Sequence, residues 1–286
     1  MATMILENEL NSPLILSSPH SGNYYPDFFL NKIDVDIEIY RSIEDMFVND
    51  LIQDLSNNDF TKHISKLSRA VIDLNRDKRE VEPDNFIGKL GFDAMPSSYV
   101  RSGIGLIPVN SPKGKLRYKK KYKVEELMFL INNFYEPWHQ DLRKKIDQKL
   151  KKFDNVFLLD CHSMPSKDFI NNKDLLLPDF ILGDCFGKTF DIKYVKYIEN
   201  FLKEEGFSVV RNNFYSGGYI TKSYFDIAKN VRTLQIEIRR DLYMDEDNYK
   251  KNSNFGKIKK VLTELISSLN TKIIDDIYSS GKIAAQ

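Results

Sequence analysis

Side chains able to bind a metal or move a proton recur next to short apolar runs of the sequence. His20 closely follows one such run, and His162 follows another, with Asp160 two residues before it. Glu237 interrupts a third run, and the pair Asn75-Arg76 follows a fourth. Parallel strands end at one edge of a sheet, where open α/β proteins bind their ligands. We therefore expect these side chains to meet in one site.

The elements that must position these side chains are predicted from the apolar periodicity. Uninterrupted apolar runs are typical of strands buried on both faces, and three- to four-residue spacing is typical of helices. Strands are expected at residues 14–16, 70–74, 156–159, 180–184, 207–210 and 234–238. Helices are expected at 34–55, at 193–205, at 249–274 and at 124–150, where Pro137 either kinks or separates two helical runs. The predicted fold class is α/β, with a mixed, mostly parallel sheet flanked by helices.

Residues 77–112 show little periodicity and are rich in Gly, Pro, Asp and Ser. A long irregular segment inside a compact domain usually has a functional role, such as a lid or a pocket wall. We expect this role here. The rest of the chain has no internal repeat or linker, so one domain covering residues 1–286 is predicted.

Composition narrows the class of protein. The chain has 286 residues, 42% of them hydrophobic, and a formal net charge of +1, which gives no general attraction to nucleic acid or membranes. The basic stretch 113–123 is interpreted as a solvated surface. The sequence contains no apolar run of about 18 residues and no basic, apolar leader, so a cytoplasmic location is expected. Cys161 and Cys185 form no recognisable framework and are expected to be free thiols.

A metal site would need more than the two histidines. Catalytic zinc usually has three protein ligands and one open position, so a carboxylate is required. The candidates are Glu44, Asp45, Asp73, Asp160 and Glu237. Asp160 and His162 share a face of an extended strand, so Asp160 could orient the histidine instead of binding the metal.

Two further features each allow two interpretations. A carboxylate at Glu237 is costly in an apolar strand, so it either pairs with Arg239 or Arg240 or acts as a general base. Asn75-Arg76 either binds a substrate carboxylate through the planar guanidinium or forms an ordinary surface ion pair. Asp73 is expected to orient Arg76.

Several motifs together resemble one family. They are Ser-Pro-His-Ser-Gly at 18–22, Asp-Leu-Asn-Arg at 73–76, Asp-Cys-His-Ser-Met-Pro at 160–165, Gly-Gly at 217–218 and Gln-Ile-Glu-Ile-Arg at 235–239. This set resembles the N-formylglutamate amidohydrolase family, which is similar to the zinc carboxypeptidase superfamily. The resemblance runs from about residue 14 to residue 245, and its motifs are specific in combination.

The resemblance implies roles for individual residues. His20 and His162 match two metal ligands, and Glu237 matches the base. Asn75 and Arg76 match a carboxylate clamp.

One position departs from the pattern of the superfamily. Asn23 stands where these relatives have a glutamate ligand, three residues after the first histidine. The third ligand is therefore expected from Glu44 or Asp45. Asp45 is preferred because its block resembles the family's, and Glu44 stays open. His139 also lies in a family-like block, with its role open.

The resemblance implies a metal-dependent amidohydrolase that uses Zn²⁺ or another divalent metal. The expected substrate is a small N-acyl amino acid carrying a carboxylate, foremost N-formyl-L-glutamate, with no nucleic-acid or membrane partner. A related amidase or carboxypeptidase is the alternative enzyme, and a metal-free binding protein of the same fold is the alternative from another class. The intact His20, His162 and Glu237 argue against the binding protein. The acyl group and the oligomeric state stay open.

Overall fold

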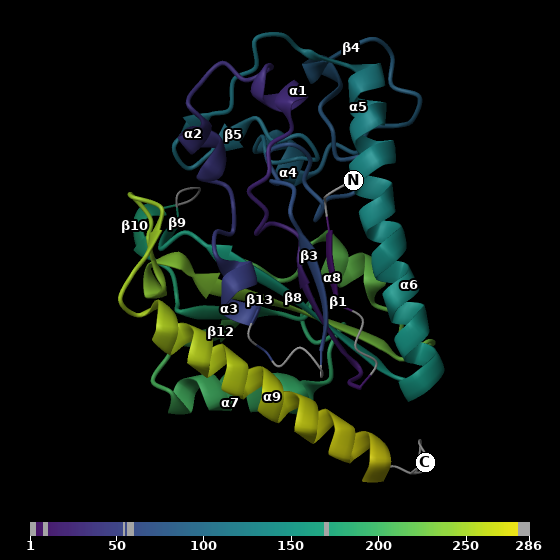
Figure 1. Ribbon diagram of the computed structural model, residues 1–286, viewed down its shortest axis with the longest axis vertical. Helices are drawn as coiled ribbons and strands as arrows, with labels where there is room; N and C mark the ends of the chain where they lie inside the picture. Colours follow the sequence, from purple (N-terminus) through teal and green to yellow (C-terminus); the bar gives the residue numbers. More distant parts are fainter. Residues whose placement is uncertain (1–3, 8–10, 54, 56–59, 169–171, 280–286) are drawn as a thin grey trace. The chain divides into compact units, whose positions relative to one another are not determined.

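The computed structural model describes residues 4–7, 11–53, 55, 60–168 and 172–279. Its chain divides into two compact units (Figure 1). The first unit comprises Met1–Ile5, Pro19–Asp45 and Ser65–Arg143, and the second comprises Leu6–Ser18, Met46–Ile64 and Lys144–Gln286. The expectation of one domain over residues 1–286 stays a prediction.

A seven-stranded sheet organises the second unit. Its strands follow the order β1-β3-β2-β8-β13-β11-β12. In chain order they are β1 (Met4–Glu7), β2 (Leu14–Ser18), β3 (Thr61–Ser65), β8 (Val156–Met164), β11 (Phe180–Gly183), β12 (Val209–Arg211) and β13 (Val231–Arg239). The pairs β2–β3, β2–β8, β8–β13 and β11–β12 are parallel, and β11–β13 is antiparallel. The predicted mixed, mostly parallel sheet is confirmed.

The two faces of this sheet differ in chemistry. All nine residues of β8 are buried, but successive side chains point to opposite faces. One face is apolar and joins the core of the unit, to which β8 contributes Phe157, Leu159 and Cys161 and β13 contributes Leu234, Ile236 and Ile238. The other face carries Asp160 and His162 from β8 and Thr233, Gln235 and Glu237 from β13. The alternation along β8 and β13 thus places these apolar side chains on one face and these polar side chains on the other.

Helices cover both faces of the sheet. The apolar face packs against side chains of α3 (Val48–Gln53), α7 (Ile192–Glu204) and α9 (Phe255–Ser279). The helices α7 and α9 lie side by side (Figure 1). On the polar face, α8 (Tyr219–Tyr224) is joined to β13 by the hydroxyl of Thr233, which donates to the carbonyl of Thr221 at 2.6 Å. The remaining elements are β9 (Lys167–Asp168), β10 (Asn172–Leu176), η3 (Arg240–Leu242), β14 (Met244–Asp245) and β15 (Lys250–Lys251).

The first unit consists of short elements around an aromatic core. Its elements include α1 (Asp27–Leu30), α2 (Ile37–Arg41), η1 (Pro83–Asn85), β4 (Phe86–Ile87), α4 (Ser98–Arg101), β5 (Asn110–Ser111), β6 (Gly114–Lys115), β7 (Tyr122–Lys123) and α5 (Val124–Leu130). Tyr118 makes edge contacts with Phe29, Tyr40 and Tyr122, at ring-centroid distances of 6.2, 5.9 and 5.1 Å. Such large rings bury much apolar surface without requiring long helices.

The predicted helix at 34–55 is wrong in its middle. The chain forms α2, leaves the helical path and re-enters it in α3. Phe47 has a φ of 63°, which no right-handed helix accommodates. The amide of Asp45 donates to the carbonyl of His20 at 3.0 Å, so a tertiary hydrogen bond replaces a helical one. Apolar spacing continues across the break because both helices are buried on one side.

The predicted strand at 70–74 is also wrong. These residues are buried, but they form a turn in which the amide of Val71 donates to the carbonyl of Ser68 at 3.0 Å. The amide of Asp73 donates to Leu106 at 2.8 Å. The strand of this region is β3, five residues earlier. A short apolar run indicates that the residues are buried. Burial alone does not distinguish a strand from a packed turn.

Several other boundaries differ from the sequence prediction. The chain stays helical through Pro137, passing from α5 through the π-helix η2 (Ile131–Tyr135) into α6 (Glu136–Phe153). Proline is tolerated there because it stands in the first turn of α6. The last helix begins at Phe255 instead of residue 249, since Lys250–Lys251 pair as β15. The helix at 193–205 is confirmed as α7.

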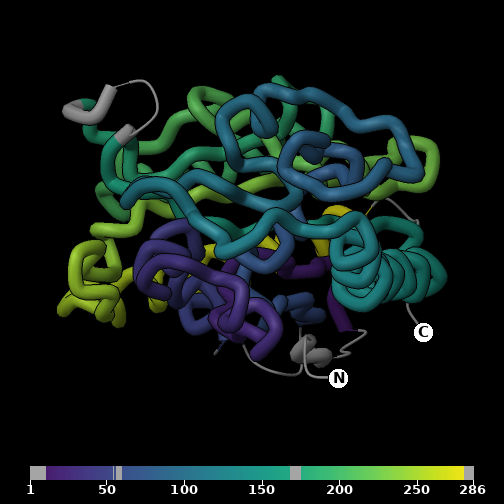
Figure 2. Tube along the Cα trace, turned by 90° about the horizontal axis from the view of Figure 1, so that it is seen from above, coloured from purple at the N-terminus to yellow at the C-terminus, as the bar shows by residue number. Residues whose placement is uncertain are grey.

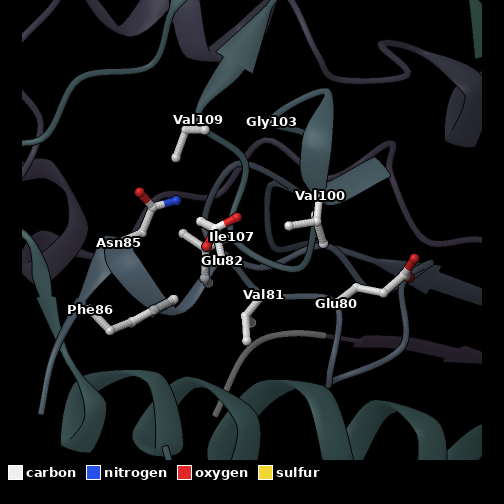
Figure 3. A pocket seen from close by; sticks show the side chains of 10 residues that line it. Glu80, Val81, Glu82, Asn85, Phe86, Val100, Gly103, Ile107 and Val109 are labelled. Atoms are coloured by element: carbon white, nitrogen blue, oxygen red, sulfur yellow. The ribbon is translucent and has the colours of Figure 1, made fainter. Parts of the chain in front are cut away.

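Residues 77–112 wind through the first unit with only short helices and strands (Figure 2). Part of this segment encloses a small pocket, with Glu80 and Glu82 among its lining side chains and Val81, Phe86 and Ile107 supplying apolar walls (Figure 3). The functional role expected of this segment stays a prediction. Among the residues described, no helix is long and apolar enough to cross a membrane.

Candidate active site

His20 lies in a tight loop just after β2. Gly22 makes this loop possible, because a Cβ atom there would come within 2.4 Å of the carbonyl oxygen of Leu67. The loop is further fixed by the amide of Asp45, which donates to the carbonyl of His20. His20 is only 2% exposed. The backbone thus holds the imidazole in one place before any ligand is considered.

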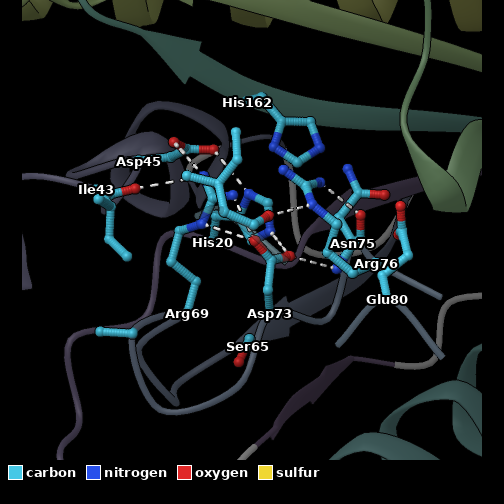
Figure 4. A network of polar contacts seen from close by, with 12 residues as sticks. His20, Ile43, Asp45, Ser65, Arg69, Asp73, Asn75, Arg76, Glu80 and His162 are labelled. Atoms are coloured by element: carbon cyan, nitrogen blue, oxygen red, sulfur yellow. Dashed lines mark hydrogen bonds and ion pairs between the residues drawn. The ribbon is translucent and has the colours of Figure 1, made fainter. Parts of the chain in front are cut away.

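Two carboxylates flank the imidazole of His20 (Figure 4). Nε2 of His20 lies 2.7 Å from Oδ1 of Asp73, and Nδ1 lies 3.5 Å from Oδ2 of Asp45. Because an ionised carboxylate only accepts hydrogen bonds, Nε2 carries the proton and donates it to Asp73. The neutral ring then has its lone pair on Nδ1, on the side of Asp45. This is the tautomer of a histidine that binds a metal through Nδ1.

Arg69 keeps Asp73 ionised. Its Nε and Nη2 donate to Oδ2 of Asp73 at 3.1 and 2.5 Å. Burial by itself would raise the pKa of this fully buried carboxyl group, but the guanidinium charges of Arg69 and Arg76 and the hydrogen bond from His20 hold the pKa well below its usual range. The sequence predicted that Asp73 orients Arg76. The side chain of Asp73 instead binds Arg69 and His20. Oδ1 of Asp73 also accepts a hydrogen bond from the amide of Asn75.

Glu44 and Asp45 point to different partners. Oε1 of Glu44 accepts hydrogen bonds from the hydroxyls of Tyr25 and Ser68, the latter at 2.8 Å. Burial raises the pKa of Tyr25 above its usual range, so this hydroxyl stays protonated and able to donate. Asp45 faces His20 and lies 3.9 Å from Arg69. This geometry favours Asp45 over Glu44 as the companion of His20.

Arg76 is buried beside Asn75 in the first unit. Its Nε and Nη1 donate to the carbonyls of Ile104 and Asn75, both at 2.8 Å, and the guanidinium stacks on the ring of Tyr99 at 4.0 Å. Tyr135 fixes the backbone by donating to the carbonyl of Arg76 at 2.7 Å. Within the described part of the chain, Arg76 forms no ion pair and Nη2 has no hydrogen-bond acceptor. A guanidinium only 6% exposed thus keeps a positive charge available to an anionic ligand.

In the second unit, His162 is paired with Asp160. Nε2 of His162 lies 2.9 Å from Oδ2 of Asp160, and both side chains are buried. The two residues stand two apart on β8, so they share the polar face of the sheet. A carboxylate that accepts from Nε2 again places the lone pair on Nδ1. His162 therefore repeats the arrangement of His20, with a nearby buried aspartate.

Glu237 is the register partner of His162 on the neighbouring parallel strand β13. It is 5% exposed, and its other strand neighbour is the buried Ile181. Gln235 donates from Nε2 to Oε1 of Glu237 at 2.6 Å. Of the two arginines expected as alternative partners of Glu237, Arg239 pairs with Asp179 and Asp241, and Arg240 donates from Nε to Oγ of Ser163 at 3.2 Å.

His139 is completely buried in the first unit. Its ring packs on Tyr135 and Trp138 at centroid distances of 4.2 and 4.9 Å. The ring of His139 thus packs beside Tyr135, the residue that fixes the backbone of Arg76.

Sequence reasoning missed Arg69 and Tyr99. The sequence gives only a weak indication that Arg69 pairs with Asp73, namely their spacing of four residues. That indication was lost because the pair forms in a turn that was expected to be a strand. Tyr99 has no local signal, since its contact with Arg76 joins positions 23 residues apart in an irregular segment.

The fold and these side chains define a class of protein. A mostly parallel α/β sheet with buried histidines held by aspartates and a buried glutamate is typical of hydrolases that act on small molecules.

Comparison with known proteins gives the family. The family model for N-formylglutamate amidohydrolase matches residues 12–244. An N-formylglutamate deformylase from Pseudomonas putida is 30% identical over 242 residues, covering 82% of each chain. One from Pseudomonas aeruginosa is 27% identical over 243 residues, covering 82% of this chain and 83% of the relative. The chain belongs to the N-formylglutamate amidohydrolase family.

Solved structures agree with this assignment. The crystal structure of N-formylglutamate amidohydrolase from Ralstonia eutropha JMP134 matches with a TM-score of 0.88 and 30% identity, covering 98% of this chain and all of the other. A gene product of Agrobacterium tumefaciens shares the fold with a TM-score of 0.68 at 17% identity, covering 95% of this chain and 96% of its own. The protein is an amide hydrolase, and the family resemblance of its motifs is confirmed.

Proposed function

We propose that this protein hydrolyses N-formyl-L-glutamate to formate and L-glutamate with a divalent metal, foremost Zn²⁺, held by His20, Asp45 and His162. The observation that carries the metal site is the matched orientation of the two histidines. Each is held through Nε2 by a buried aspartate, Asp73 or Asp160, and so directs its lone pair through Nδ1. The names of the bacterial relatives supply the substrate.

The donor set fits a zinc ion. Each of His20, Asp45 and His162 offers one buried ligand atom, and two histidines with one carboxylate are a common catalytic zinc set. The same ligands also suit other divalent ions.

Arg76 is assigned to the substrate carboxylate. Two of its five N–H groups are used by backbone carbonyls, and Tyr99 holds the guanidinium plane. The remaining donors suit a carboxylate, which fits the fork of a guanidinium in a bidentate manner. Asn75, buried beside Arg76, is proposed as its companion in the clamp.

Glu237 is assigned as the general base. A bound divalent metal supplies Lewis acidity, which polarises an amide carbonyl and acidifies water. Glu237 accepts a proton from the attacking water and delivers it to the departing amino group, so the C–N bond breaks with formate and a free amine as products. Ile181, the register partner of Glu237 on β11, gives this carboxylate an apolar neighbour on one side.

The decisive experiment combines metal analysis with a substrate series on the purified protein. We expect about one divalent ion per chain, hydrolysis of N-formyl-L-glutamate in preference to N-acetyl-L-glutamate and N-formyl-L-glutamine, and loss of activity on chelation with recovery on adding Zn²⁺. His162→Ala should release the ion. Full metal occupancy in that variant would remove His162 from the site, and hydrolysis of none of the N-acyl amino acids would refute the activity.

A further inference from the structure

We propose that Gln235 is the positioning residue of Glu237, and that it works through a hydrogen-bond chain anchored on the backbone of Gly218. This inference rests on the proposed role of Glu237 and extends it. All of the residues involved belong to the second unit, and two of them stand on the polar face of β13.

The orientation of the Gln235 amide is fixed by its partners. The backbone N–H of Gly218 lies 2.5 Å from the side-chain oxygen Oε1 of Gln235. A backbone N–H only donates, so the atom facing Gly218 must be the oxygen. The amino group Nε2 is therefore turned toward Glu237, to which it donates at 2.6 Å. A reversed amide would set two donors against each other at one end and two acceptors at the other.

Two glycines bring the anchor into place. A Cβ atom on Gly183, the register partner of Gln235 on β11, would lie 2.8 Å from the backbone nitrogen of Gly217. Gly217 itself has a φ of 124°, and a Cβ atom there would meet Sγ of Cys185 at 2.8 Å. The loop before α8 thus lies directly on the sheet because neither position carries a side chain. Its next amide, that of Gly218, then reaches Gln235.

This chain of hydrogen bonds restricts the position of the Glu237 carboxylate. A charge-assisted hydrogen bond from a side chain only 4% exposed fixes Oε1 and with it the plane of the carboxylate. The orientation of this carboxylate plane decides how its oxygens meet the water whose proton Glu237 accepts. Since a base must be within hydrogen-bond reach of the proton it accepts, loss of this fixation should lower kcat more than substrate binding.

Two variants of Gln235 separate the contact with Glu237 from the contact with Gly218. Gln235→Glu keeps an acceptor for the amide of Gly218 but removes the donor to Glu237. Gln235→Met removes both hydrogen bonds with little change in volume. We expect both variants to lower kcat for N-formyl-L-glutamate by roughly 10- to 100-fold, with KM within about twofold and metal content unchanged.

Thr233→Val is the matched control. Thr233 stands two residues earlier on the same face of β13, is fully buried, and donates to the carbonyl of Thr221 in α8. The substitution removes a buried hydrogen bond between β13 and α8, the helix that directly follows Gly218, without touching Glu237. It should lower the melting temperature about as much as Gln235→Met does and leave kcat near the wild-type value. A loss of kcat as large as that of the Gln235 variants would show that general loosening of β13 explains both.

A double-mutant cycle with Glu237→Ala decides whether Gln235 acts through Glu237. If it does, Gln235→Met should cause no further loss of kcat in the Glu237→Ala background. Independent, multiplicative losses would overturn the proposal. If Glu237→Ala loses activity but Gln235→Met keeps its kcat, the role of Gln235 is overturned and the role of Glu237 as base is not. Retention of kcat by Glu237→Ala would refute the proposed base, and the role of Gln235 with it.

Discussion

Nε2 of His20 lies 2.7 Å from Oδ1 of Asp73, and both side chains are almost fully buried. The contact fixes the tautomer of the histidine before any metal arrives. His162 has the same relationship to Asp160 at 2.9 Å. In each pair the aspartate sets which ring nitrogen offers its lone pair, which is the orientation that the proposed metal site requires.

Asp73→Asn tests this preparation. The amide keeps the shape of the side chain but allows its nitrogen to face His20, which would favour the tautomer with the proton on Nδ1. We expect metal affinity to fall roughly 10- to 100-fold, as is typical when the outer partner of a histidine ligand is lost. Metal titration followed by calorimetry measures the change. Unaltered affinity would show that Asp73 serves Arg69 and the fold only.

Glu44 and Asp45 offer a matched pair of neighbouring carboxylates. Asp45→Asn should lose most of the bound metal, because this carboxylate is the one that faces His20. Glu44→Gln should keep the metal but destabilise the protein by about 1–3 kcal/mol, since it disturbs buried hydrogen bonds from Tyr25 and Ser68. Metal content and denaturant unfolding of both variants provide the comparison. The opposite pattern would make Glu44 the ligand.

Arg76→Lys tests recognition of the substrate carboxylate. Lysine keeps the charge but loses the planar fork and the stack on Tyr99. We expect KM to rise strongly for N-formyl-L-glutamate and little for a substrate whose carboxylates are replaced by amides. Steady-state kinetics on both substrates measures the difference. Equal increases for the two would assign Arg76 to the fold.

Glu237→Gln tests the base directly. Glutamine is nearly isosteric, so metal content and KM should be retained, while kcat should fall roughly 10²- to 10⁴-fold, the usual contribution of a positioned acid–base group. The acidic limb of the pH–rate profile should disappear as well. A variant that lost stability but kept kcat would mean that Glu237 has a structural partner and no part in proton transfer.

The two thiols should differ in reactivity. Cys161 is buried and Cys185 is partly exposed, and burial raises the pKa of both thiols above the usual value. Since the thiolate is the reactive form, a raised pKa lowers the reactive fraction at neutral pH. A thiol reagent at pH 8 should therefore modify Cys185 slowly and Cys161 only after unfolding. Rapid modification of both in the folded protein would contradict the packing of β8.

The sequence by itself determined which side chains of β8 and β13 lie on the same face of the sheet. In β8 and β13, alternation puts Asp160, His162 and Glu237 on one face, and any register that buries the apolar face keeps them on that face. The run of apolar residues also fixed the mostly parallel sheet. Local covalent geometry and side-chain period were sufficient for these conclusions.

Only the tertiary structure decided the contacts made by irregular backbone. The choice of Asp45 over Glu44 follows from a break between α2 and α3, where the amide of Asp45 bonds to His20. The pairing of Asp73 with His20 joins positions 53 residues apart through a buried turn. Such contacts leave no periodic pattern in the sequence, because the conformation of a turn depends on the hydrogen bonds that the surrounding chain provides. For the same reason Gln235 gained its role only when two glycines let a distant loop lie on the sheet.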